Sequence, residues 1–322
     1  MKAEAMGRKT IKFANGAVNY AVLMAIVLLT AFAGYALWDS RQIHNAADSA
    51  KYAAYKPTAG NQGKSFKELQ ALNPEVFAWL SVYGTNIDYP VAQGQDNMKY
   101  VNTNAEGQYS LSGSIFLDCT NSRDFSGFNS ILYGHHMAQK VMFGEIEYFS
   151  DSSVFDSHRY GNLYFDGKDH GIEFFAFVHT DAYDLSVFTP DVQGAQRQAY
   201  LDGLLAKAAC KRDIGATVQD RLVLLSTCSS ASTNGRDILI GRVTDNVFED
   251  APTAGGAAGL QEEGDQYCSV SEVPPWVPLL LLALAARLAA QALAACHRRA
   301  RHRGPDKSGK RGQGSGAGPL RF

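Results

Sequence analysis

Three polar residues stand at the ends or starts of apolar, strand-like runs, and their types suit acyl-transfer chemistry. Cys228 closes the run that begins at Arg221, and the serines after it would leave its thiol open to solvent. His135 lies two residues beyond the run that ends with Tyr133, and Arg236 begins the next run after Asn-Gly. A thiolate is a nucleophile, an imidazolium favours that thiolate and can protonate a leaving amine, and a guanidinium can hold an oxyanion.

Each of these residues also has an ordinary structural interpretation. A free cysteine is among the most buried residue types, and neighbouring histidines such as His135 and His136 are usually surface polar residues. An arginine at the start of a strand is ordinarily a solvated charge. The short connection after Cys228 predicts an antiparallel neighbour, however, and that pairing would set Arg236 beside the cysteine. The combination, rather than any single residue, favours catalysis.

The elements that would position these residues are mostly short strands bounded by Gly, Asn and Asp. The predicted strands are 114–117, 130–133, 162–165, 172–179, 221–227 and 237–243. Two helices are predicted, a short one at 66–72 and a longer one at 195–210 with one apolar side. Short, turn-separated strands indicate a mainly β fold of the barrel type within residues 64–248.

Three motifs in this order resemble the signature of sortases: Tyr-Gly-His at 133–135, Leu-Ser-Thr-Cys at 225–228 and the strand that Arg236 begins. The resemblance covers roughly residues 66–247. Class B is suggested by Asp-Asn-Met-Lys-Tyr at 96–100, by the segment 113–118 and by the long helix before the cysteine strand. It implies a closed sortase-type β-barrel with an N-terminal helix and that long helix. The hydropathy of the chain predicts membrane helices that would flank this barrel.

The same resemblance implies roles for individual residues. Cys228 would be the nucleophile, His135 the general acid, and Arg236 the group that orients substrate and steadies the oxyanion. Residues expected near the substrate pocket are Ser226, Thr227, Tyr133 and Asn97. His136 departs from the family pattern, which often has another residue there.

The implied reaction is a two-step exchange on the outer face of a Gram-positive-like envelope. The thiolate attacks the threonine carbonyl of a C-terminal sorting motif on a secreted protein, and an amine of peptidoglycan or of a pilin resolves the thioacyl enzyme. Neither step requires a metal or another cofactor. A secreted cysteine peptidase that only hydrolyses peptides, and a non-catalytic membrane-tethered binding domain, are the alternative functions.

The N-terminal part predicts a membrane anchor at residues 17–38, because about twenty apolar residues span a bilayer. Residues 1–16 are basic, so the positive-inside bias predicts a cytoplasmic N-terminus and an extracytoplasmic catalytic domain at the cell membrane. Residues 39–63 would be a juxtamembrane linker or helix. The alternative is a cleaved signal peptide, since Ala-Phe-Ala at 31–33 offers a cleavage pattern.

The C-terminal part predicts a linker at 249–275, a second candidate transmembrane helix at 276–296 and a basic tail at 297–322. Arg287 interrupts that apolar stretch at a cost of about 2.5–3.5 kcal/mol on insertion scales. The stretch therefore suits either a span packed against a partner or a helix in the membrane interface.

Composition excludes several other classes. A formal net charge of -2 leaves no basic surface for nucleic acid. The chain has 5 cysteines without a CxxC pair, which indicates neither a zinc site nor a disulfide framework. A lone working thiol fits this cysteine pattern better.

Overall fold

The computed structural model describes residues 2–57, 64–230 and 232–250. Most of the predicted linker 249–275, the second candidate membrane helix 276–296 and the basic tail 297–322 lie outside these residues. The described chain falls into two compact units, one with residues up to Gly34 and one from Tyr35 onward. Each unit is described by itself.

The chain begins with the long helix α1 (Lys2–Ala47). The helical stretch Phe13–Tyr55 contains an 18-residue window with a mean hydropathy of 2.1, and none of that window is buried. Among the described residues, this is the helix that is long and apolar enough to cross a membrane. The predicted anchor 17–38 lies within α1. The helix continues past the predicted anchor and ends at Ala47. There the 3-10 helix η1 (Ser49–Tyr55) begins, with the side chain of Asp48 as its N-cap.

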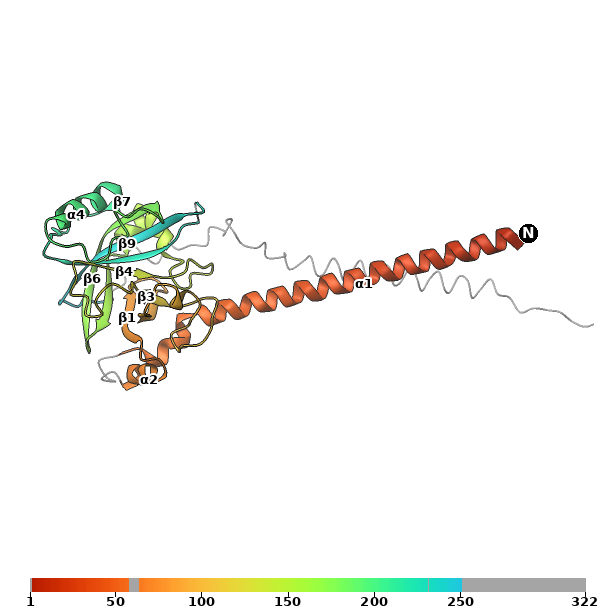
Figure 1. The fold of residues 1–322 in the computed structure, drawn as a ribbon, viewed down its shortest axis with the longest axis horizontal. Coiled ribbons are helices and arrows are strands. Elements are labelled where there is room, and N and C mark those ends of the chain that lie inside the picture. Colours follow the sequence, from red (N-terminus) through yellow and green to blue (C-terminus); the bar gives the residue numbers. More distant parts are fainter. Residues whose placement is uncertain (1, 58–63, 231, 251–322) are drawn as a thin grey trace, which may run out of the picture. The chain divides into compact units, whose positions relative to one another are not determined.

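Eight strands of the described chain close into a barrel in which each strand is hydrogen-bonded to two neighbours (Figure 1). The strands are β1 (Val76–Val82), β2 (Asp88–Ala92), β3 (Ile115–Leu117), β4 (Asn129–Tyr133), β5 (Tyr160–Phe165), β6 (Lys168–Asp181), β8 (Arg221–Cys228) and β9 (Gly235–Thr244). Their order is β5-β1-β2-β3-β4-β8-β9-β6, and pairing of β6 with β5 closes the ring. The predicted closed barrel is therefore confirmed.

All six predicted strands are present, and the fold adds β1, β2 and β7 (Ala208–Lys211). The helix predicted at 195–210 is partly wrong, because α4 (Gln196–Lys207) ends at Lys207 and the next residues form β7. The reason lies in one edge of β6. The first half of this edge pairs with β5, and β7 pairs with the same edge farther along. Backbone groups at a strand edge need partners, so the open part of that edge takes up these residues as a strand although two alanines and a lysine favour a helix.

The remaining helices are short and lie against the barrel. They are α2 (Lys64–Leu72), η2 (Lys99–Val101), η3 (Ile146–Ser150) and α3 (Ser152–Ser157). The predicted helix at 66–72 corresponds to α2 and is confirmed. α4 lies against β6 and β7, and Figure 1 shows it next to β7.

The core consists of two clusters on the two faces of the sheet. The larger cluster takes buried side chains from all eight ring strands and fills the barrel. The smaller cluster lies under α4 and includes Leu201 and Leu204. Along β8 the side chains alternate between them, since Val223 and Leu225 join the barrel interior and Leu224 joins the α4 side. This alternation decides which way the residues at the end of β8 face.

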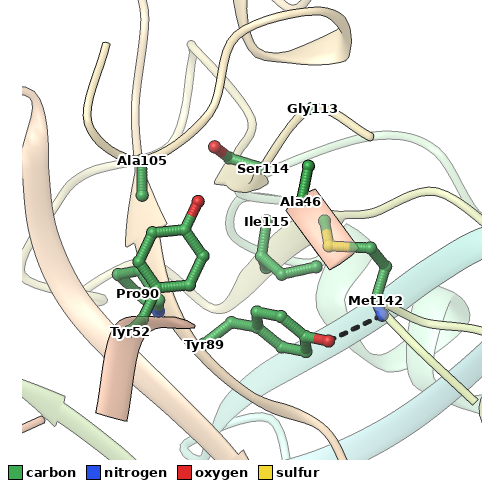
Figure 2. A pocket seen from close by; sticks show the side chains of 9 residues that line it. All are labelled: Ala46, Tyr52, Tyr89, Pro90, Ala105, Gly113, Ser114, Ile115 and Met142. Carbon is green, nitrogen blue, oxygen red and sulfur yellow. Dashed lines mark hydrogen bonds between the residues drawn. The ribbon is translucent and has the colours of Figure 1, made fainter. Parts of the chain in front are cut away.

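The junction between α1 and η1 is docked on the barrel through Tyr89 of β2. Its hydroxyl donates to the carbonyl of Ala47 at 2.9 Å and accepts from the backbone N–H of Met142 at 2.9 Å. Figure 2 shows Tyr89 and Met142 beside a cavity of about 10 Å³, no larger than one water molecule. One hydroxyl thus joins the N-terminal segment, β2 and the loop after β4.

We expect Tyr89→Phe to lower the free energy of unfolding by about 1–3 kcal/mol, because the change leaves a buried carbonyl and a buried N–H without their partner. Urea denaturation of the full chain measures the change. The matched control is Tyr183→Phe, where the ring is 79% exposed and the expected change is within about 0.5 kcal/mol. An equal effect of both substitutions would contradict the role of the Tyr89 hydroxyl.

Candidate active site

The ends of three neighbouring strands bring the predicted catalytic residues to one end of the barrel. Cys228 and Arg236 are direct partners in the antiparallel pairing of β8 with β9, which confirms the predicted pairing. In the parallel pairing of β4 with β8, Tyr133 is the partner of Ser226, and the Gly134 N–H continues it by donating to the Ser226 carbonyl at 3.1 Å. His135 follows one residue after this bond, beyond the end of β4 and at the same end of the sheet as Cys228.

The thiol and the guanidinium lie on the same face of the sheet. Residues two apart on a strand share a face, so Cys228 lies on the same face as Ser226 and Leu224. Arg236 likewise shares this face with Ile238 on the adjacent strand. Farther along the strands, α4 covers this face. The Cys228 side chain is exposed, as a nucleophile must be. The half-buried Arg236 donates from Nη1 to the Gly235 carbonyl at 2.8 Å, which leaves the rest of its donor fork for other acceptors.

The imidazole of His135 has a defined hydrogen-bond partner. Its Nε2 lies 2.8 Å from the carbonyl oxygen of Val101 at the end of η2. Because a carbonyl can only accept, the proton of that hydrogen bond belongs to Nε2. Nδ1 is therefore the nitrogen left to exchange a proton with a reacting group.

His136 faces a different element from its neighbour. Its Nε2 lies 3.1 Å from Oε2 of Glu147 in η3, and the same oxygen accepts from the Ser230 hydroxyl at 2.8 Å. At this distance the imidazole and the carboxylate form an ion pair when His136 is protonated. The nearby carboxylate raises the pKa of His136, and the imidazolium lowers the pKa of Glu147.

Two of the residues predicted near the substrate, Tyr133 and Asn97, meet at the buried carboxylate of Asp118. The Asn97 amide donates to Oδ2 of Asp118 at 2.8 Å, and the Tyr133 hydroxyl donates to the same oxygen at 3.1 Å. The Asn97 carbonyl oxygen accepts from the backbone N–H of Cys119 at 2.8 Å. Burial, and then the charge of Asp118, raises the pKa of Tyr133, which keeps it a donor.

The other two predicted substrate residues do not share a face. Ser226 lies on the face of Cys228, whereas Thr227 points toward the barrel interior with Leu225. Both residues are 2% exposed, and within the described part of the chain neither hydroxyl has a hydrogen-bond partner. A buried hydroxyl without a partner costs free energy, and of the two the Ser226 hydroxyl is the one on the face of the thiol.

Sequence reasoning missed three groups that contact the site. Asp118 is the last residue of the segment 113–118, which suggests a class B sortase, so the sequence does indicate that this position matters. The Val101 carbonyl and Glu147 had none, because their roles depend on contacts across the barrel end. Over residues 2–57, 64–230 and 232–250, no three His, Cys, Asp or Glu side chains are grouped so that they could hold a metal.

A closed barrel with an exposed cysteine and a paired arginine at adjacent strand ends defines the sortase class of proteins. No family model matches the chain. The sortase B of Staphylococcus aureus is 31% identical over 182 residues, which cover 55% of this chain and 74% of that protein. The chain belongs to the sortase B family.

Two solved structures support the same assignment. Sortase B from the type II pilus of Streptococcus pneumoniae is 47% identical, with a TM-score of 0.50, and the match covers 56% of this chain and 99% of that one. A Streptococcus pyogenes class B sortase involved in pilus biogenesis is 41% identical, with a TM-score of 0.52, over 56% of this chain and 99% of that one. Both matches agree with the closed barrel described above.

Proposed function

We propose that this protein is a membrane-anchored cysteine transpeptidase, which cleaves a C-terminal sorting motif of secreted proteins and transfers the acyl group to a cell-wall or pilin amine. Membership of the sortase B family supports a transpeptidase role. The observation that carries the assignment of residues is the direct pairing of Cys228 with Arg236, with His135 two residues beyond the end of the neighbouring strand β4. No other strand end in the described chain combines an exposed thiol with these two groups.

In the first step the Cys228 thiolate attacks the threonine carbonyl of the sorting motif. Arg236 donates to the oxyanion that forms, and the tetrahedral intermediate collapses to a thioester. The leaving amine takes a proton from His135, at Nδ1 if Nε2 keeps its bond to the Val101 carbonyl.

In the second step an acceptor amine attacks the thioester. His135 takes the proton that the amine loses, Arg236 again holds the oxyanion, and the Cys228 thiolate leaves. The bond broken in the substrate is thus replaced by a new amide bond, so no oxidant, metal or nucleotide enters the balance. The Ser226 hydroxyl, on the same face, supports substrate binding near the thiol.

Membrane attachment through α1 is part of the proposal. The apolar part of α1 would span the bilayer, the basic residues 1–16 would stay in the cytoplasm, and the domain 64–248 would act outside. The Streptococcus pneumoniae and Streptococcus pyogenes relatives are described as pilus sortases, which favours a pilin amine among the acceptors to be tested. Peptidoglycan amines remain the other acceptor class.

The full chain in detergent can be tested with a peptide library that has threonine at the cleaved position. We expect a thioacyl adduct on Cys228 and a product that forms only when triglycine or a lysine peptide is added, because an amine outcompetes water for the thioester. Mass spectrometry identifies both species. Product of the same mass with and without amine would indicate a simple cysteine peptidase, and binding without any adduct would indicate a non-catalytic binding domain.

A further inference from the structure

One carboxylate connects the two loops that carry the proposed catalytic residues. Glu147 lies in η3, and its Oε2 contacts both the imidazole of His136 at 3.1 Å and the hydroxyl of Ser230 at 2.8 Å. His136 directly follows His135, and Ser230 stands two residues after Cys228. A single oxygen atom therefore bridges the histidine loop and the cysteine loop.

We propose that Glu147 is a positioning residue, which clamps the loop of His135 to the loop of Cys228 through His136 and Ser230. This inference rests on the proposed function for the roles of His135 and Cys228. Glu147 touches neither the thiol nor the His135 imidazole, so it acts through its two partners.

The backbone explains why a clamp is needed at this point. The hydrogen bonds between β4 and β8 continue only to the bond of the Gly134 N–H with the Ser226 carbonyl, one residue before His135. The other backbone contacts near His135 hold its loop to itself, since the Phe143 N–H donates to the His135 carbonyl and His136 forms a β-bridge with Met142. The His135 side chain is held by the Val101 carbonyl of η2, not by β8. The Glu147 contacts extend across the gap between β4 and β8 where the backbone pairing has stopped.

The charges around His136 make this clamp dependent on pH. Glu147 faces the imidazole from η3, and Asp237 acts on it from β9 while holding Nδ1 of His179 at 2.7 Å. Both carboxylates favour the imidazolium, burial opposes it, and the pKa of His136 is raised above its ordinary value. A raised folded-state pKa means that the ion pair is complete at pH values below about 6.5 and weakens as the pH rises through the folded pKa.

The test compares Glu147→Gln with the wild type from pH 6 to pH 9. Glutamine keeps an acceptor for Ser230 but removes the charge that holds His136. We expect acyl transfer by the full chain to fall about fivefold at pH 6, and the two rates to converge as the pH rises through the raised pKa of His136, because a neutral imidazole loses its charge attraction to Glu147. A residue that only supports the fold would lower the rate by the same factor at every pH, and that result would overturn the proposal.

A second variant controls for misfolding of Glu147→Gln. Ser230→Ala removes an exposed hydroxyl that donates to Glu147, and we expect the rate of acyl transfer to fall about twofold to threefold. The matched control is Glu106→Gln, which breaks an ion pair with Lys51 at 3.0 Å in another part of the domain and should change neither rate nor pH profile.

Alkylation of Cys228 by iodoacetamide, followed at the peptide level by mass spectrometry, needs no sorting peptide. We expect Glu147→Gln to slow this reaction at pH 6 by about the same factor as acyl transfer, since the imidazolium near the thiol is less well placed. If the wild type turns over no peptide, the proposed function fails while the alkylation profile still decides the role of Glu147. Identical alkylation profiles of variant and wild type would overturn the clamp.

Discussion

Cys228→Ala abolishes both cleavage of sorting peptides and transfer to an amine, because the substituted residue is the proposed nucleophile and no thioester can form without it. The fold should be unchanged, since the side chain is exposed and contributes little packing. The measurements are product formation and adduct mass with the full chain, together with urea denaturation of both proteins. Retained turnover would exclude Cys228 as the nucleophile.

The other cysteines are the matched controls for this prediction. Serine replacement of each should preserve turnover; the four residues are Cys119, Cys210, Cys268 and Cys296. Cys119 and Cys210 are half-buried thiols away from the pairing of β8 with β9, and the other two lie outside the described residues. A loss at one of the four as large as that of Cys228→Ala would mean that the nucleophile is that cysteine.

The second large effect separates the two adjacent histidines. His135→Ala should reduce acyl transfer at least about a hundredfold, the usual cost of removing a general acid, whereas His136→Ala should reduce it only several-fold. The contacts support this ranking, because the His135 imidazole is held by the Val101 carbonyl of η2 and keeps Nδ1 for proton exchange, while His136 contacts Glu147. Loss of His136 removes one partner of a clamp, whereas loss of His135 removes the proton donor.

Steady-state kinetics of both variants, with triglycine as acceptor, decides between the histidines. Circular dichroism of each variant controls for folding, because the two residues lie in one loop. The reverse ranking would assign the general acid to His136. It would also mean that the chain after β4 presents the other side of its register to Cys228.

The sequence by itself predicted the elements whose signal is local. Each strand that ends at a proposed catalytic residue is bounded by turn residues, so β4, β8 and β9 were predicted nearly to their ends. The short connection between Cys228 and Arg236 was enough to predict their pairing, because a hairpin restricts the neighbour of a strand. The apolar length of α1 likewise needs no tertiary information.

Three strands escaped prediction for physical reasons that differ. β1 is buried at all but one position, so its residues show no alternation of apolar and polar side chains. β2 contains Pro90, which weakens a strand prediction although this residue is buried in the barrel wall. β7 has four residues of a helix-like pattern and becomes a strand only because β6 offers an unpaired edge.

Only the tertiary structure decided how the site residues face and which of them meet. Asp118 joins Asn97 to Tyr133, and Glu147 joins His136 to Ser230, through contacts between segments far apart in the chain. These contacts exist because β3 and β8 pair with the two edges of β4, and because η3 packs against β9 near the end of β8. Residue types and spacing therefore determined which chemistry the chain carries, and the pairing and packing of distant segments determined which side chains position it.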